Sequence, residues 1–118
     1  MQTIRQKRTA DQIQMLLSEL LLRDLKDPRV QGVTIMDVRV DRELQYADVY
    51  VHALGEEERE EEVLEGLKSA SGFVRHRVAQ ALNTRSVPQM HFHWDPSVAH
   101  ADRMHQLLDE LVVPDEEE

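Results

Sequence analysis

Cysteine is absent from the sequence, which excludes both a disulfide framework and a thiolate metal site. Glycine is scarce, and its four positions are scattered, so the chain has no glycine-rich phosphate-binding loop. No apolar run approaches the roughly 18 residues of a membrane-spanning helix. The first eight residues are polar and basic and lack the apolar core of a secretory signal. These absences predict a cytoplasmic protein with no membrane partner.

Recognisable catalytic motifs are also missing. The chain has no nucleophile elbow and no His-Glu-x-x-His helix, and no two of its carboxylates stand out as an acid–base pair. His91 and His93 share one face of an expected strand, and His52 could join them from a neighbouring strand. Three imidazoles could bind zinc, but a solvent-facing polar row explains the same pattern. We expect no enzyme, no metal site and no cofactor.

What the sequence does contain is the pattern of one α+β domain. Its 118 residues are 41% hydrophobic and 31% charged, as in soluble globular proteins. The strands have one apolar face each, so we expect two layers, with helices on that face. We expect one domain over residues 1–113 and a disordered acidic tail over 114–118. Apolar periodicity predicts strands at 33–40, 46–53 and 89–94, a β-bulge near Asp37, and a last amphipathic helix over 98–111.

The first helix has two candidate starting points. Thr9 and Gln12 match a capping box, whereas an earlier start would place the basic residues of 5–8 on the helix. Asp27-Pro28 should end this helix, because the residue before proline is disfavoured in helical conformation.

Residues 63–82 carry one apolar stripe at helical spacing, interrupted by small residues. Glycine costs about 1 kcal/mol relative to alanine inside a helix, and serine hydroxyls compete for backbone hydrogen bonds. We therefore predict two helices that meet at a kink around Ala70, Ser71 and Gly72. An ordinary helical hairpin, with the glycine kept for packing, is the structural alternative.

The net charge of −9 argues against nucleic acid, but the charges are unevenly distributed. Residues 56–66 hold seven glutamates and one arginine, a net of −6, whereas residues 67–90 hold four cations and no acid. Exposed charges are screened beyond about 8 Å in cell salt, so a local basic surface can still bind RNA. We predict phosphate contacts around the kink by Lys68, Ser71, Gly72, Arg75, Arg77 and Arg85.

Two further charged segments have open interpretations. A second phosphate contact by Arg5, Lys7 and Arg8 is as well supported as a solvated, frayed terminus. The run Glu56–Glu62 is most simply a solvated acidic face, and repulsion of RNA by that face is the alternative.

Short motifs are spread over almost the whole chain, namely Arg8-Thr-Ala, Lys26-Asp-Pro-Arg29, Tyr46-Ala-Asp-Val-Tyr-Val51, Ala70-Ser-Gly-Phe-Val-Arg75, Arg85-Ser-Val-Pro88, Phe92, Asp95-Pro-Ser97 and Arg103-Met104. Their order and spacing together resemble the ribosome-binding factor A family. The resemblance implies a KH-like fold of the second type, in the order α-β-β-α-α-β, with an Ala-x-Gly kink in place of a Gly-x-x-Gly loop. The chain departs from the family at Ala101, where a glycine is usual, and in its acidic C-terminus.

The same resemblance implies a non-enzymatic bacterial assembly factor that is linked to growth in the cold. Such a factor binds the free 30S subunit and assists maturation of the 5′ end of 16S rRNA. We expect a monomer, with other assembly factors as further candidate partners. The alternative is a protein-interaction module whose acidic face docks a basic ribosomal protein or an assembly GTPase. A small metal-dependent enzyme built on His91 and His93 is a third hypothesis.

Overall fold

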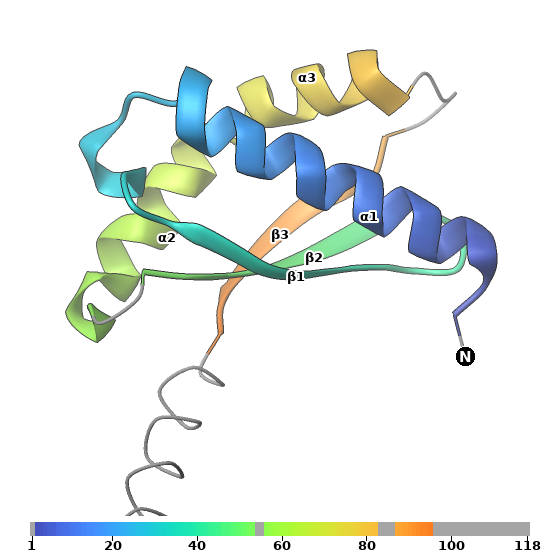
Figure 1. Cartoon of the computed structure of the whole chain (residues 1–118), viewed down its shortest axis with the longest axis horizontal. Helices are drawn as coiled ribbons and strands as arrows, with labels where there is room; N and C mark the ends of the chain where they lie inside the picture. The colour runs from blue at the N-terminus through green and yellow to red at the C-terminus, as the bar shows by residue number, and fades with distance from the viewer. Residues whose placement is uncertain (1, 54–55, 83–86, 96–118) are drawn as a thin grey trace, which may run out of the picture.

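The computed structural model describes residues 2–53, 56–82 and 87–95. Figure 1 shows the order of its elements, which are α1 (Ile4–Glu19), β1 (Thr34–Val40), β2 (Tyr46–His52), α2 (Glu60–Ser69), α3 (Ser71–Leu82) and β3 (Gln89–Trp94). This is the predicted α-β-β-α-α-β order of a two-layer, KH-like α+β domain. The predicted last helix, the acidic tail and Arg85 lie outside the described residues.

Helix α1 begins at Ile4, so the start predicted at Thr9 is wrong and the earlier alternative is correct. The Thr3 Oγ1 accepts a hydrogen bond from the Gln6 N–H, and the Gln6 Oε1 accepts one from the Thr3 N–H. This capping box satisfies two donors that would otherwise lack partners. The Gln6 Nε2 also donates to the Val40 carbonyl at 2.9 Å, which ties the first turn of α1 to β1.

The first helix ends sooner than Asp27-Pro28, contrary to the prediction. A π-helical turn, Leu20–Asp24, follows α1 and closes with a 2.8 Å hydrogen bond from the Leu25 N–H to the Leu20 carbonyl. Leu25 then adopts an extended conformation. Asp27 instead caps a short 3-10 helix, Pro28–Val30, by accepting from the Arg29 N–H.

The sheet has the order β1-β2-β3, with β2 in the centre. Strands β1 and β2 form an antiparallel hairpin, and its register shifts between Ile35 and Asp37, which confirms the predicted bulge. Strand β3 lies parallel to β2. A parallel neighbour requires a crossover, and the pair α2 and α3 supplies it.

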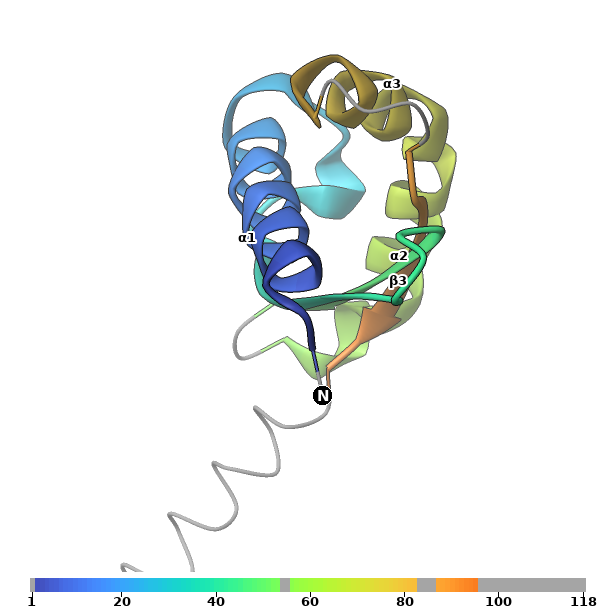
Figure 2. The same cartoon turned by 90° about the vertical axis from the view of Figure 1, so that its right-hand side faces the viewer.

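All three helices cover the same face of the sheet (Figure 2). The inward side chains of β2 (Ala47, Val49 and Val51) are fully buried. They pack in one core with side chains from each helix, namely Ile13, Leu17, Val63, Leu67, Val74 and Val78. Burying apolar surface stabilises a fold by about 25 cal/mol per Å². This shared core is therefore the main contribution that holds α2 and α3 over β3.

Ala70 separates α2 from α3, so the predicted kink is confirmed. Its φ and ψ are −89° and 0°, and its carbonyl accepts from the Val74 N–H at 2.9 Å, which begins α3. Gly72 is the second residue of α3, and a Cβ built on it would meet nothing within 4 Å. The alternative of a glycine kept for packing is therefore wrong at this position.

Candidate nucleic-acid interface

A groove lies between the kink and β3. One hollow of about 260 Å³ is lined by Ser71, Gly72, Arg75, Gln89, Met90 and His91. A second hollow of about 340 Å³ is lined by Leu64, Lys68, Ser71, Met90, His91 and Phe92. The two share Ser71, Met90 and His91, so they form one surface with the start of α3 on one side and β3 on the other. We call this surface the kink groove.

The floor of the kink groove at α3 is suited to an anion. The first N–H groups of a helix have no partner within that helix, and the partial positive charge of its N-terminus attracts negative groups. Ala70, which precedes α3, has no side-chain oxygen to satisfy them. The open space beside Gly72 leaves the backbone accessible to a ligand of phosphate size.

Two cations flank this helix start. Lys68 lies on the last turn of α2 and Arg75 on the second turn of α3, and both side chains are exposed. Among the described residues, no carboxylate forms an ion pair with either of them. Toward the described residues, Arg75 donates one long hydrogen bond, 3.4 Å, to the Val87 carbonyl. Both charges are therefore available to phosphate groups.

Arg77 lies on the other side of α3. Its Nη1 is 3.4 Å from the Asp24 Oδ2, and its guanidinium carbon lies 5.7 Å from the centre of the Phe73 ring. It lines a separate hollow between α1 and α3. The structure thus brings Lys68, Ser71, Gly72 and Arg75 together and places Arg77 elsewhere.

The basic residues of α1 form a different surface. Arg5, Lys7 and Arg8 are exposed on the first turns of α1, and Lys7 pairs with Asp11 at 3.5 Å. The first turn of α1 is anchored on β1, at the opposite edge of the sheet from β3. These residues are on a helix rather than a frayed terminus, but they do not extend the kink groove.

All six glutamates of the acidic run are exposed, as predicted for a solvated face, but three of them also have polar partners. Arg59 binds Glu56 at 2.8 Å and Glu62 at 2.9 Å, and these carboxylates raise its pKa. Glu57 accepts from the Trp94 Nε1 at 3.0 Å and lies 2.6 Å from the His52 Nε2. The run precedes and opens α2, whereas the kink is at the far end of that helix, about 15 Å away along its axis.

His52 is buried, although its position in the strand predicts an outward side chain. Only 1% of it is exposed, because the ring of Trp94, 4.6 Å away, and the carboxylate of Glu57 lie against it. His91 and His93 instead lie beside Tyr46 and Tyr50. Among residues 2–53, 56–82 and 87–95, no group of three or more His, Cys, Asp or Glu residues is placed to hold a metal ion.

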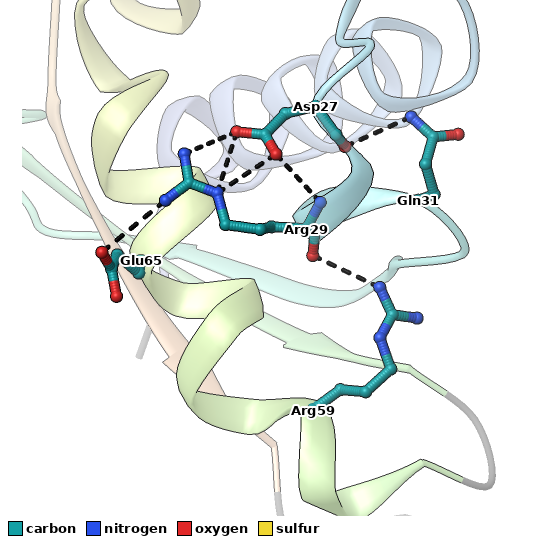
Figure 3. A network of polar contacts seen from close by, with 5 residues as sticks. All are labelled: Asp27, Arg29, Gln31, Arg59 and Glu65. Atoms are coloured by element: carbon teal, nitrogen blue, oxygen red, sulfur yellow. Dashed lines mark hydrogen bonds and ion pairs between the residues drawn. The ribbon is translucent and has the colours of Figure 1, made fainter.

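The arginines near the 3-10 helix Pro28–Val30 have structural roles (Figure 3). Arg29 forms hydrogen bonds to both carboxylate oxygens of Asp27, the shortest at 2.6 Å. These bonds lower the pKa of Asp27 and raise that of Arg29. Arg29 also reaches Glu65 on α2 at 3.7 Å, and Arg59 donates to the Arg29 carbonyl at 3.3 Å. These contacts fix α2 against the segment that precedes β1.

Sequence reasoning missed the β3 side of the kink groove, namely Gln89, Met90 and His91. The Gln89 N–H donates to the Gln45 carbonyl and the Asp95 N–H to the Val51 carbonyl. Alternate residues of a parallel strand bond to the same neighbour, so the backbone groups of Met90 and Phe92 point to the free edge of β3. The predicted break at Val87-Pro88 and parallel pairing to β2 were the signals that could have located this edge.

No helix in the described part of the chain is long and apolar enough to cross a membrane.

Comparison with known proteins matches residues 5–108 to the family model "Ribosome-binding factor A". The ribosome-binding factor A of Alcanivorax borkumensis is 49% identical over 114 residues, which are 96% of this chain and 83% of that protein. The crystal structure of ribosome-binding factor A from Thermus thermophilus is 27% identical, with a TM-score of 0.65, and the match covers 75% of this chain and 93% of that one. A Thermus thermophilus homology model fitted into a cryo-electron microscopy map of a 30S complex is 28% identical, with a TM-score of 0.62 and coverages of 74% and 91%. The chain belongs to the ribosome-binding factor A family.

Proposed function

We propose that this protein is a non-enzymatic assembly factor that binds the free 30S subunit through RNA held in the kink groove. The carrying observation is the start of α3, where the open space beside Gly72 meets Lys68 and Arg75, which form no ion pair with any described carboxylate. Its Thermus thermophilus relative has been fitted into a map of a 30S complex, which supports the same partner here.

The geometry suits a single RNA strand that crosses the groove. One phosphate would sit at the N-terminus of α3, where the backbone of Ser71 and Gly72 is accessible. Lys68 and Arg75 would pair with flanking phosphates, the arginine with a more rigid fork. The backbone groups of Met90 and Phe92, which point away from β2, would face the bases from β3. Nothing in this arrangement requires bond cleavage.

Holding an immature strand of 16S rRNA in this way would assist maturation of its 5′ end by preventing wrong pairings. We extend the proposal to that role and to a cytoplasmic monomer. We also propose RNA-binding roles for Arg85 and, at sites separate from the kink groove, for Arg5, Lys7, Arg8 and Arg77. Nuclease activity that persists through purification would contradict the non-enzymatic part.

Co-sedimentation with free small subunits tests the proposal. Lys68→Glu with Arg75→Glu should abolish binding, because two phosphate contacts become repulsions. Arg77→Glu should weaken binding less, since its guanidinium already faces Asp24 on the other side of α3. Large subunits and joined ribosomes serve as binding controls. Undiminished binding by the double variant, with its fold intact, would refute the kink groove as the RNA site.

A protein-docking role for the acidic face is the second candidate. Glu58, Glu60 and Glu61 are exposed, and no ion pair to them is found within the described residues. If Glu60→Lys with Glu61→Lys abolishes subunit binding while Lys68→Glu with Arg75→Glu does not, this candidate replaces the RNA proposal.

A further inference from the structure

The outward face of the sheet carries a set of ring contacts outside the kink groove. The ring centres of Tyr46 and His91 are 5.6 Å apart with planes inclined by 31°, and those of Tyr50 and His93 are 5.1 Å apart at 29°. The guanidinium carbon of Arg39 lies 5.7 Å from the centre of the Tyr50 ring. We call this surface the ring face, formed by Arg39, Tyr46, Tyr50, His91 and His93.

The ring face begins where the kink groove ends. His91 lines both hollows of the groove and also lies against Tyr46. Strand β3 is the edge that separates the two surfaces. An RNA strand that leaves the groove across β3 therefore meets His91 first and Tyr46 next, without crossing a helix, because the helices cover the opposite face (Figure 2).

Charge on the ring face does not oppose RNA. Two acids, Asp37 and Asp48, share this face, and each is paired. The Asp48 Oδ1 lies 2.9 Å from the His93 Nε2, and the Asp37 Oδ2 accepts from the Arg39 Nε at 3.1 Å. The ring of Tyr46 is accessible, with 46% of the residue exposed, and Arg39 is also exposed, with its guanidinium near the Tyr50 ring.

We propose that the ring face is a stacking surface for bases of single-stranded RNA that continues from the kink groove. Aromatic and imidazole planes stack with any base, so this contact would add affinity without reading sequence. The inference deepens the proposed function and rests on it. It makes the bound element a single strand longer than the groove alone can hold, because a duplex cannot turn its bases toward the rings.

RNA length separates the two surfaces. The probes are single-stranded RNAs of about four nucleotides, the number that a KH loop clamps, and of about ten, each with a duplex control. Tyr46→Ala should weaken binding of the longer RNA about 5- to 150-fold, the range for one stacked base, and leave the shorter RNA unchanged. Tyr46→Phe should bind like the wild type because it keeps the ring, and Leu22→Ala, at a side chain 84% exposed on the first helical segment, is the matched surface control.

Salt dependence provides a second readout. Stacking releases no counterions, so Tyr46→Ala should leave the slope of log affinity against log salt unchanged, whereas Arg75→Ala should reduce it by about 1. Ultraviolet cross-linking of the wild-type protein to the longer RNA should modify peptides that carry Tyr46 or His91, and this result does not depend on the folding of a variant.

Several outcomes would overturn the inference. Equal affinity of Tyr46→Ala and wild type for the longer RNA would remove stacking while leaving the kink groove intact, whereas failure of the wild type to bind either RNA would remove the proposed function itself. If Tyr46→Ala loses binding to the subunit but binds the longer RNA as the wild type does, the ring face contacts a protein partner instead. Protection of Tyr46 from hydroxyl-radical labelling in the free full-length chain would show that something other than RNA already covers it.

Discussion

Two glycines six residues apart have opposite surroundings. A Cβ on Gly66 would lie 2.9 Å from both the Arg29 Cβ and the Val30 Cγ1, whereas a Cβ on Gly72 would meet open space. Gly66 lets α2 pack directly on the 3-10 helix Pro28–Val30. Gly72 has no such packing requirement, which supports the binding role proposed for its accessible backbone.

Alanine at these two positions should therefore have different effects. Gly66→Ala should lower the free energy of unfolding by about 1–3 kcal/mol through overpacking. Gly72→Ala should leave stability unchanged or raise it by up to about 1 kcal/mol, because alanine is the better helix former, and should weaken subunit binding. Urea unfolding and co-sedimentation measure the two effects. Stability losses of equal size would contradict the packing difference.

The ion pair of Asp27 with Arg29 should make stability depend on acid pH. Arg29 lowers the pKa of folded Asp27 below its ordinary value of 3.8, so the unfolded chain takes up the proton first as the pH falls. The stabilisation is complete above the ordinary value and is lost as the pH falls through the folded pKa. Asp27→Asn keeps a helix cap but lacks this contribution.

The difference in unfolding free energy between wild type and Asp27→Asn should thus be largest near neutral pH and should close at acid pH. Urea unfolding between about pH 7 and pH 3 measures it. A difference that stays constant over this range would show that Asp27 acts through its cap alone.

Some single-residue environments could not be predicted from the sequence. The burial of His52 depends on contacts with Glu57 and Trp94. Both residues lie on other elements, so the alternation of side chains along β2 does not predict these contacts. Arg77 looked like a groove cation because no acid is near it in the sequence, yet Asp24 is its partner across the fold. The charges of residues 67–90 show that this segment is basic. The ion pair of Arg77 with Asp24 depends instead on how α3 packs against the helical segment that contains α1.

At the scale of elements, Glu57 joins the end of β2, the 3-10 helix Glu57–Arg59 and the end of β3 through His52 and Trp94. Water would replace the Glu57 carboxylate poorly at His52, since that side chain is 1% exposed. The acidic run therefore includes one residue that fixes the sheet to α2.

Glu57→Ala should lower the free energy of unfolding by about 1–3 kcal/mol, because it leaves a buried donor on His52 without its partner. Glu58→Ala, at the exposed neighbouring position, should change it by no more than about 0.5 kcal/mol. Trp94 is the single tryptophan of the chain, so its fluorescence directly reports changes at the contact with Glu57 and His52. Equal effects of both changes would contradict the role assigned to Glu57.

Apolar periodicity predicted which elements exist better than where they begin and end. The stripes of α1, α2 and α3 and the alternation of β2 follow from burial on one face, which the sequence encodes locally. The start of α1 was ambiguous because the sequence contains two Thr-x-x-Gln patterns, at Thr3 and at Thr9, and the helix uses the first. The π-helical turn at Leu20–Asp24 has no periodic signature, so the end of that helix was misplaced.

At the scale of the whole molecule, opposite charges lie at opposite ends of α2. Glutamates precede and open the helix, whereas Lys68 and the start of α3 lie at its end. The separation explains how a chain of net charge −9 can present a local site for a polyanion. The kink and its cations were predictable from the sequence. The β3 side was missed because its residues are neutral, and the break at Val87-Pro88 marks only where the strand begins, not that it lies beside the kink.

Binding to the small subunit should weaken as salt is added. If about four to six phosphates of a single strand are neutralised, the slope of log affinity against log salt should be about −3 to −4. Removing Arg75 should reduce the slope by about 1, whereas removing Arg77 should change it less. Affinity measurements at several potassium chloride concentrations test this, and a salt-independent affinity would contradict phosphate recognition.

The parallel pairing of β3 with β2 also has a consequence for biosynthesis. The hairpin of β1 and β2 can form from neighbouring residues, but β3 reaches its place only after α2 and α3 have been made. During translation the nascent chain therefore lacks half of its kink groove until Trp94 has left the ribosome. We therefore expect the complete groove, and any binding that needs its β3 side, to form only after this last strand has been synthesised.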